Sequence, residues 1–218
     1  MNSPLPHAVI FDWDNTLVDS WGAINEAMNA TLAHFGRPLW TPEEVRANCT
    51  RAARDSFPEW FGDRWQEASD VFYARFAEVQ MANLSPLAGA ADLLAWLSGR
   101  SVPLFVVSNK NGDYLRREAA VLEWERYFAA IVGSTDAPRD KPAREHVDYA
   151  LRETGIEAGP DIWFVGDSET DIACARNAGC MPVFIGRPDE AQRHGVDLAV
   201  ADCAALLGLL QERLRAIA

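Results

Sequence analysis

Four aspartates stand where two short apolar runs of the sequence end. The run AVIF leads into DWDNT, which holds Asp12 and Asp14, and the run IWFV leads into GDSETD, which holds Asp167 and Asp171. Like charges that converge are unfavourable unless a cation neutralises them. Carboxylate oxygens without His or Cys suit a hard cation, and a site shared with phosphate favours Mg²⁺ over Ca²⁺. If the two segments meet in the fold, the aspartates predict a magnesium site.

Two further segments carry polar groups suited to the same chemistry. The apolar run LFVV ends in Ser108, Asn109 and Lys110, and Lys141 stands in the short segment DKPA. Taken alone, any one aspartate of the chain is most simply a helix cap or a turn residue. Several such groups at the ends of apolar runs favour a site over isolated caps.

The elements that must position these residues follow from the alternation of the sequence. Apolar runs of strand length occur at 8–11, 103–107, 129–132, 162–165, 182–185 and 198–200. Amphipathic segments of helical length lie at 113–122, 143–152, 170–178 and 206–217. This alternation predicts an α/β fold with a doubly wound parallel sheet. Ligands of such sheets bind beyond the carboxyl ends of the strands, where the polar segments would meet.

One interval breaks the alternation, because about ninety residues separate the first two runs. Helical segments are predicted there at 20–35, 42–49, 52–61 and 64–79, with N-cap candidates at Asp19, Ser20 and Thr41. We therefore expect a helical domain at 18–85, inserted into an α/β domain made of 1–17 and 86–218. The inserted segment is rich in aromatic residues, which at helical spacing favour packing over a platform for substrate.

Composition excludes several classes of protein. The net charge of −12, without a dense run of Lys or Arg, argues against nucleic acid and anionic membranes as partners. The cysteines are scattered and are expected to be reduced thiols: Cys49, Cys174, Cys180 and Cys203. No segment approaches the roughly 20 apolar residues of a membrane span, and the N-terminus lacks the pattern of a signal peptide. A cytoplasmic protein is expected, and its oligomeric state is left open.

These motifs resemble those of the haloacid dehalogenase superfamily, in its phosphoglycolate phosphatase-like branch with a helical cap inserted after the first motif. The resemblance rests on IFDWDNTLVDS, LFVVSNK, DKPA and FVGDSETD, in this order, and it covers essentially the whole chain. It implies a Rossmann-like core with a cap domain and a Mg²⁺-dependent phosphatase acting on a small-molecule phosphomonoester. Asn15 stands where many relatives have Gly, and Asn tolerates the left-handed backbone that such a loop needs.

The resemblance also implies roles for individual residues. Asp12 would be the nucleophile that forms an aspartyl-phosphate, and Asp14 the general acid and base. Lys141 would offset charge on the nucleophile and the phosphoryl group. The remaining roles fall to residues beside these: phosphate binding to Ser108, Asn109 and Lys141; Mg²⁺ binding to Asp12, Asp167 and the backbone carbonyl of Asp14; support to Thr16 and Asp171.

Other interpretations stay open at this point. Arg51 and Arg54 in the inserted domain are candidates for substrate specificity, or they belong to a solvated helix face. His146 is expected to be a surface residue. A phosphomutase or phosphotransferase would carry the same motifs, and a non-catalytic phosphate-sensing or partner-binding module is the alternative outside enzymes. Asp14 favours phosphate-ester chemistry, since in this superfamily the dehalogenases lack that acid and the ion-pumping ATPases have Thr there.

Overall fold

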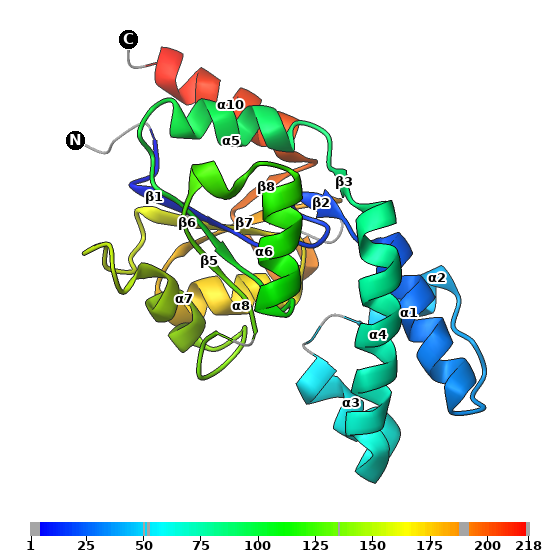
Figure 1. Ribbon diagram of the computed structural model, residues 1–218. Coiled ribbons are helices and arrows are strands. Elements are labelled where there is room, and N and C mark those ends of the chain that lie inside the picture. The colour runs from blue at the N-terminus through cyan, green and yellow to red at the C-terminus, as the bar shows by residue number, and fades with distance from the viewer. Residues whose placement is uncertain (1–4, 50, 52, 135, 188–191, 217–218) are drawn as a thin grey trace. The chain divides into compact units, whose positions relative to one another are not determined.

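The computed structural model describes residues 5–49, 51, 53–134, 136–187 and 192–216 (Figure 1). It divides into two compact units. The first comprises the chain up to Val18 together with Pro86 onward, and the second comprises Asp19–Ser85. The chain passes between them at two short strands that pair with each other, β2 (Val18–Asp19) and β3 (Ser85–Pro86).

The first unit is built on a six-stranded sheet in the order β5-β4-β1-β6-β7-β8. All of its neighbouring strands run parallel. The strands are β1 (Ala8–Phe11), β4 (Leu104–Val107), β5 (Phe128–Val132), β6 (Ile162–Gly166), β7 (Met181–Ile185) and β8 (Leu198–Val200). Every residue of β1, β4 and β6 is buried, as expected of central strands covered on both faces. The predicted α/β fold with a doubly wound parallel sheet is confirmed.

Helices cover both faces of this sheet. They are α5 (Ala90–Ser98), α6 (Gly112–Val121), α7 (Arg144–Leu151), α8 (Glu169–Ala178) and α10 (Cys203–Arg215). The pair α5 and α10 lies on one face and the pair α7 and α8 on the other (Figure 1). Helix α5 was not predicted, because its nine residues directly follow a turn-rich segment that reads as a hinge. Gly89, in the left-handed conformation, marks the point where the turn becomes that helix.

The strand order fixes where a site can form. Because β1 lies between β4 and β6, the loops after these three strands leave the same edge of the sheet side by side. The chain winds outward in opposite directions from β1, and such a switch point is where open α/β sheets bind ligands. The motif segments DWDNT and SNK follow β1 and β4, and GDSETD begins at Gly166, the last residue of β6.

The second unit is helical: α1 (Trp21–His34), α2 (Pro42–Asn48), α3 (Ala53–Phe61) and α4 (Trp65–Asn83). Helix α2 begins with a capping box, in which Thr41 and Glu44 each bond the backbone of the other. The aromatic side chains of the helical unit pack on one another around the buried residues Phe57 and Phe61. The aromatic composition of this segment is thus explained by the unit's own core.

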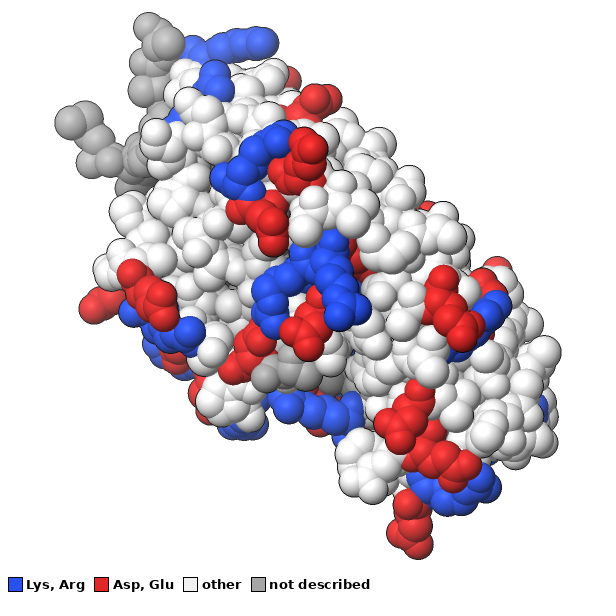
Figure 2. Space-filling view, viewed as in Figure 1, with Lys and Arg blue, Asp and Glu red and all other residues white. Residues whose placement is uncertain are grey.

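Charged side chains of both signs are interspersed on the face shown in Figure 2. Several ion pairs of the described residues join side chains three or four positions apart on one helix, such as Arg144 with Asp148 at 3.0 Å. All four cysteines are free thiols. Within the described ranges, no helix has both the length and the apolar character that crossing a bilayer requires.

Candidate active site

The loop after β1 is a tight turn closed by backbone hydrogen bonds. The carbonyl oxygen of Trp13 accepts the N–H groups of Leu17 at 2.9 Å and Val18 at 3.1 Å. Asn15 has a φ of 64°, so the left-handed backbone expected at this position is present. The turn begins one residue after Asp12, whose N–H still bonds the carbonyl of Val165 on β6. Asp12 is therefore held at the strand end while Asp14 lies on the turn.

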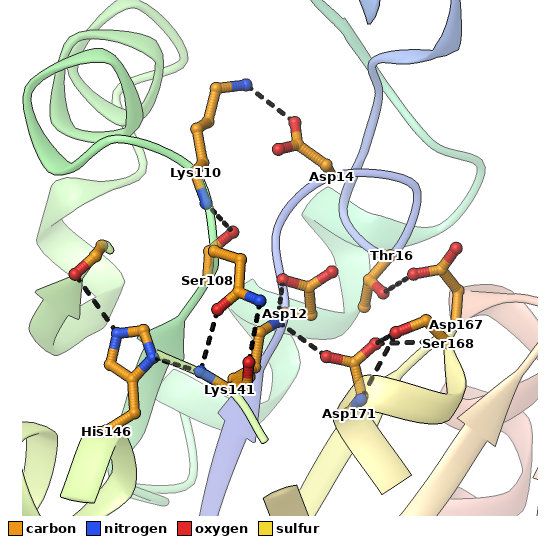
Figure 3. A network of polar contacts seen from close by, with 12 residues as sticks. Asp12, Asp14, Thr16, Ser108, Lys110, Lys141, His146, Asp167, Ser168 and Asp171 are labelled. Atoms are coloured by element: carbon orange, nitrogen blue, oxygen red, sulfur yellow. Dashed lines mark hydrogen bonds and ion pairs between the residues drawn. The ribbon is translucent and has the colours of Figure 1, made fainter. Parts of the chain in front are cut away.

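Lys141 joins two of the predicted acids (Figure 3). Its Nζ lies 2.6 Å from Oδ1 of Asp12 and 2.7 Å from Oδ1 of Asp171, and all three side chains are buried. Burial alone would lower the pKa of Lys141, but the two carboxylates raise it above its ordinary value. The ammonium group thus stays charged and offsets two carboxylates at once.

The backbone of Lys141 is held as firmly as its side chain. Its N–H donates to Oδ1 of Asn109 at 2.9 Å and to Nδ1 of His146 at 3.1 Å, and its carbonyl accepts Nδ2 of Asn109 at 3.1 Å. The opposite ring nitrogen of His146 contacts the carbonyl of Gly133 at 3.2 Å. Nδ1 therefore accepts and Nε2 carries the proton, which makes the ring neutral.

One expectation is corrected by this arrangement, and one contact is added to it. His146 is fully buried rather than a surface residue, because its ring links the loop of Lys141 to the end of β5. The side chain of Asn109 binds the backbone of Lys141, so this asparagine connects the motif after β4 to the lysine segment.

Asp171 is placed by the first turn of α8. Oδ2 of Asp171 accepts the N–H of Ser168 at 3.0 Å, and the N–H of Asp171 donates to Oγ of Ser168 at 3.3 Å, which completes a capping box. The Oγ–H of Ser168 also contacts Oδ2 of Asp171 at 2.6 Å. A Cβ at Gly166 would lie 2.3 Å from the Cβ of Asp171, so only glycine fits at the end of β6. Thr16 donates to Oδ1 of Asp167 at 3.3 Å, linking the first and fourth motifs.

Three of the four predicted aspartates gather into a possible metal site. One oxygen from each of Asp12, Asp167 and Asp171 lies within 4.8 Å of the other two. Burial raises the pKa of Asp12 to about 7, against the lowering effect of Lys141, and raises that of Asp167 well above its ordinary value. Mutual repulsion with Asp171 adds to both shifts. Closely placed carboxylates that resist ionisation fit a divalent cation with oxygen ligands.

The fourth acid, Asp14, points to a different partner. Its Oδ1 lies 2.7 Å from Nζ of Lys110, which also lies 2.7 Å from Oε2 of Glu118 (Figure 3 shows the pair with Asp14). The indole N–H of Trp13 donates to the same oxygen of Glu118 at 2.7 Å. Sequence reasoning gave no role to Lys110, Glu118 or Trp13. The available signal was Glu118 itself, a charged residue on the apolar face of α6.

The remaining predicted residues divide between the two units. Ser108 is buried at the end of β4, where its Oγ accepts the N–H of Lys110 at 3.3 Å. Arg51 forms two hydrogen bonds with Glu59, at 3.0 and 2.5 Å, within the helical unit. Arg54 lies on α3 of that unit. The structure therefore brings together the residues predicted in the α/β unit, while both arginines belong to the other unit.

The sequence matches the protein-family model of the haloacid dehalogenase-like hydrolases over residues 9–185, a range that includes all four motifs. The chain belongs to this family.

Several known proteins are similar to this hydrolase over almost its whole length. A phosphoglycolate phosphatase of Chromobacterium violaceum is 31% identical over 97% of this chain and 99% of its own length. A crystal structure of a haloacid dehalogenase-superfamily hydrolase from Ehrlichia chaffeensis is 29% identical, covers 96% of this chain and 98% of its own, and has a TM-score of 0.67. A crystal structure of a predicted phosphoglycolate phosphatase from Haemophilus somnus is 22% identical, covers 95% of this chain and 98% of its own, and shares the fold with a TM-score of 0.82. The chain is thus an enzyme of the phosphoric monoester hydrolase type, and the predicted resemblance to the phosphoglycolate phosphatase-like branch of this superfamily is confirmed.

Proposed function

We propose that this hydrolase cleaves a small-molecule phosphomonoester in a Mg²⁺-dependent reaction through an aspartyl-phosphate on Asp12. The observation that carries the proposal is the contact of Lys141 with Asp12 and Asp171 beside Asp167. A carboxylate nucleophile must meet an anionic phosphoryl group, and a buried cation at 2.6 Å offsets that repulsion.

The reaction has two balanced halves. An oxygen of Asp12 attacks phosphorus and the ester bond breaks, while Asp14 gives its proton to the departing alcohol oxygen. Water then attacks the aspartyl-phosphate, Asp14 takes a proton from it, and inorganic phosphate leaves with the carboxylate of Asp12 restored. Ser108 and the backbone N–H of Asn109 are proposed to hold phosphoryl oxygens.

Asp12, Asp167 and the backbone carbonyl of Asp14 are the proposed Mg²⁺ ligands, and Asp171 fixes Lys141 next to them. When bound, Mg²⁺ supplies positive charge that stabilises the phosphoryl oxygens. The side chains present fit this assignment, because the carboxyl groups of Asp12 and Asp167 carry raised pKa values and a cation would stabilise their charged forms.

We propose 2-phosphoglycolate as the first substrate to test. Support comes from the Chromobacterium violaceum phosphoglycolate phosphatase, which matches the chain over nearly its whole length. The helical unit Asp19–Ser85 is the proposed cap domain that selects among phosphate esters, with Arg51 and Arg54 as candidates for contact with an anionic substrate.

Release of inorganic phosphate from a panel of metabolite phosphates, with Mg²⁺ and after EDTA, tests the proposal. We expect 2-phosphoglycolate to rank among the best substrates and EDTA to abolish turnover. Full activity after exhaustive EDTA treatment would contradict the metal requirement. Transfer of phosphate to a sugar hydroxyl without phosphate release would indicate a mutase instead.

A second measurement addresses the covalent step. With an activated substrate whose leaving group needs no proton, Asp14→Asn retains the nucleophile but loses water activation. Acid-quenched protein should therefore carry one added phosphate, mapped to Asp12 after borohydride trapping. Asp12→Asn should carry none. An adduct on Ser108 or on a histidine would refute this mechanism.

A further inference from the structure

Asp14 ends a chain of buried contacts that joins the loops after β1 and β4. Oδ1 of Asp14 lies 2.7 Å from Nζ of Lys110, and Nζ lies 2.7 Å from Oε2 of Glu118. That oxygen accepts the indole N–H of Trp13 at 2.7 Å. Since Trp13 precedes Asp14 in the sequence, the contacts close a ring through the backbone.

The ring is anchored inside the protein and opens toward solvent only at Asp14. The exposed fraction of the side chain is 2% for Glu118 and 4% for Lys110, but 21% for Asp14. Exposed ion pairs contribute little to stability, whereas removing one partner of a buried pair leaves a costly unpaired charge. The contact between Lys110 and Asp14 is therefore a fixed feature of the site and not a mobile surface pair.

The neighbouring elements hold both ends of this chain in place. The indole ring of Trp13 packs edge-on against Trp124, with ring centres 5.8 Å apart. The carbonyl of Lys110 accepts the N–H of Ser134 at 2.9 Å. A Cβ at Gly133 would lie 2.6 Å from that carbonyl oxygen, so the two loops approach each other as closely as glycine permits.

We propose that Lys110, held by Glu118, which Trp13 in turn fixes, is a positioning residue that fixes the carboxyl group of Asp14 for proton transfer. The inference rests on the proposed function, in which Asp14 protonates the leaving alcohol. Proton transfer requires the acid within hydrogen-bond reach of the reacting oxygen, and a freely rotating side chain meets that condition for less of the time. Lys110 binds one carboxyl oxygen and thereby restricts that rotation.

A role exerted through Asp14 predicts dependence on the leaving group. p-Nitrophenyl phosphate loses a stable phenolate without protonation, whereas benzyl phosphate, of similar shape, releases an alcohol that needs a proton. For Lys110→Met, we expect kcat/KM to fall roughly 10- to 100-fold for benzyl phosphate and to stay within about threefold for p-nitrophenyl phosphate. With the latter, kcat and KM should fall together, because hydrolysis of the aspartyl-phosphate also uses Asp14.

Glu118→Gln provides an independent variant that keeps the size and an acceptor for Trp13. It should show the same preference with a smaller loss, and it decides the question if thermal melting shows that Lys110→Met does not fold. Arg116→Gln is the matched control, because Arg116 lies on α6 with Glu118 and the substitution removes a different ion pair, the one with Asp136. We expect it to leave both substrates within about threefold of wild type.

Asp14→Asn separates failure of this inference from failure of the proposed function. Suppose that Asp14→Asn loses more activity on benzyl phosphate than on p-nitrophenyl phosphate. If Lys110→Met and Glu118→Gln then lose the same activity on both substrates, or lose none on either, the positioning role is refuted. If the wild type hydrolyses neither substrate, or Asp14→Asn does not discriminate, the proposed function itself is wrong.

Discussion

At the residue scale, the buried ammonium group of Lys141 faces two carboxylates. Asp12 and Asp171 approach Nζ of Lys141 from two sides, at 2.6 and 2.7 Å. Removing one member of such a buried set leaves the others uncompensated. The same arrangement recurs around Lys110, which faces Asp14 and Glu118. The site thus pairs each catalytic candidate of the first motif with its own lysine.

Replacing Lys141 by Met should lower turnover at least about 100-fold, because stabilisation of the phosphoryl charge is lost. The fold should persist with Mg²⁺ present, since the cation can neutralise the acids left behind. Steady-state kinetics and circular dichroism measure the two effects. Arg144→Met, which removes the exposed pair with Asp148, is the control and should remain near wild type. Turnover of Lys141→Met within about threefold of wild type would show that Lys141 has another role.

His146 offers a test of how the backbone of Lys141 is held. His146→Asn retains an acceptor near the position of Nδ1, whereas His146→Leu removes it. We expect the Leu variant to lose roughly 1–3 kcal/mol of unfolding free energy, measured in urea, and the Asn variant to lose less. Because Asn109 still accepts the N–H of Lys141, kcat of the Leu variant should fall only about fivefold. Equal behaviour of the two variants would contradict this role of Nδ1.

At the scale of elements, the strands and the order of the motifs follow from the sequence. Apolar runs bounded by polar turns place β1, β4 and β6 to within a residue or two of their observed ends. The buried polar residues of the helices are harder to predict. Glu118 lies between Leu115 and Ala119 on the buried face of α6, and His146 lies beside Val147 on that of α7. Their partners come from other elements, which local periodicity cannot identify.

The fit of β6 against α8 can be tested at Gly166. In Gly166→Ala the new methyl group would meet the Cβ of Asp171 at 2.3 Å, so Asp171 must move away from Lys141. We expect a loss of roughly 1–3 kcal/mol of stability and a marked loss of activity. Gly208→Ala in α10 is the matched control, because its methyl group meets nothing within 4 Å. It should leave activity unchanged and stabilise the protein by about 0.5–1 kcal/mol. Equal melting temperatures for the two variants would contradict the close approach.

At the scale of the whole molecule, the long interval between the first two apolar runs predicted an inserted domain. The sequence did not predict which substrate the enzyme uses. The interval between β1 and β4 is too long for one crossover, and the structure has a compact helical unit at Asp19–Ser85. The reaction class follows from motifs with fixed chemistry. In the proposed function, substrate choice depends on side chains of the helical unit. Arg51, a candidate from sequence, is engaged with Glu59.

The acidic cluster links the stability of the molecule to pH. Burial raises the pKa of Asp12 from 3.8 to about 7, so the folded protein without metal binds a proton more tightly than the unfolded chain. The contribution of protonated Asp12 to the stability of the fold is complete below the pKa of 3.8 that this group has in the unfolded chain, and it is lost as pH rises through about 7. The raised pKa of Asp167 acts in the same direction.

A cation should reverse this loss, and the size of the reversal should depend on pH. At about pH 5 Mg²⁺ must displace the proton of Asp12, whereas at about pH 8 that carboxylate is ionised and binds the cation directly. We therefore expect Mg²⁺, compared with EDTA, to raise the melting temperature more at about pH 8 than at about pH 5, by differential scanning fluorimetry. Taking the difference at each pH cancels the titration of groups far from the site. Asp167→Asn should reduce the shift at both pH values, while Asp148→Asn, on the exposed side of α7, should not. A shift of equal size at both pH values would show that the cation binds elsewhere or that these carboxylates titrate normally.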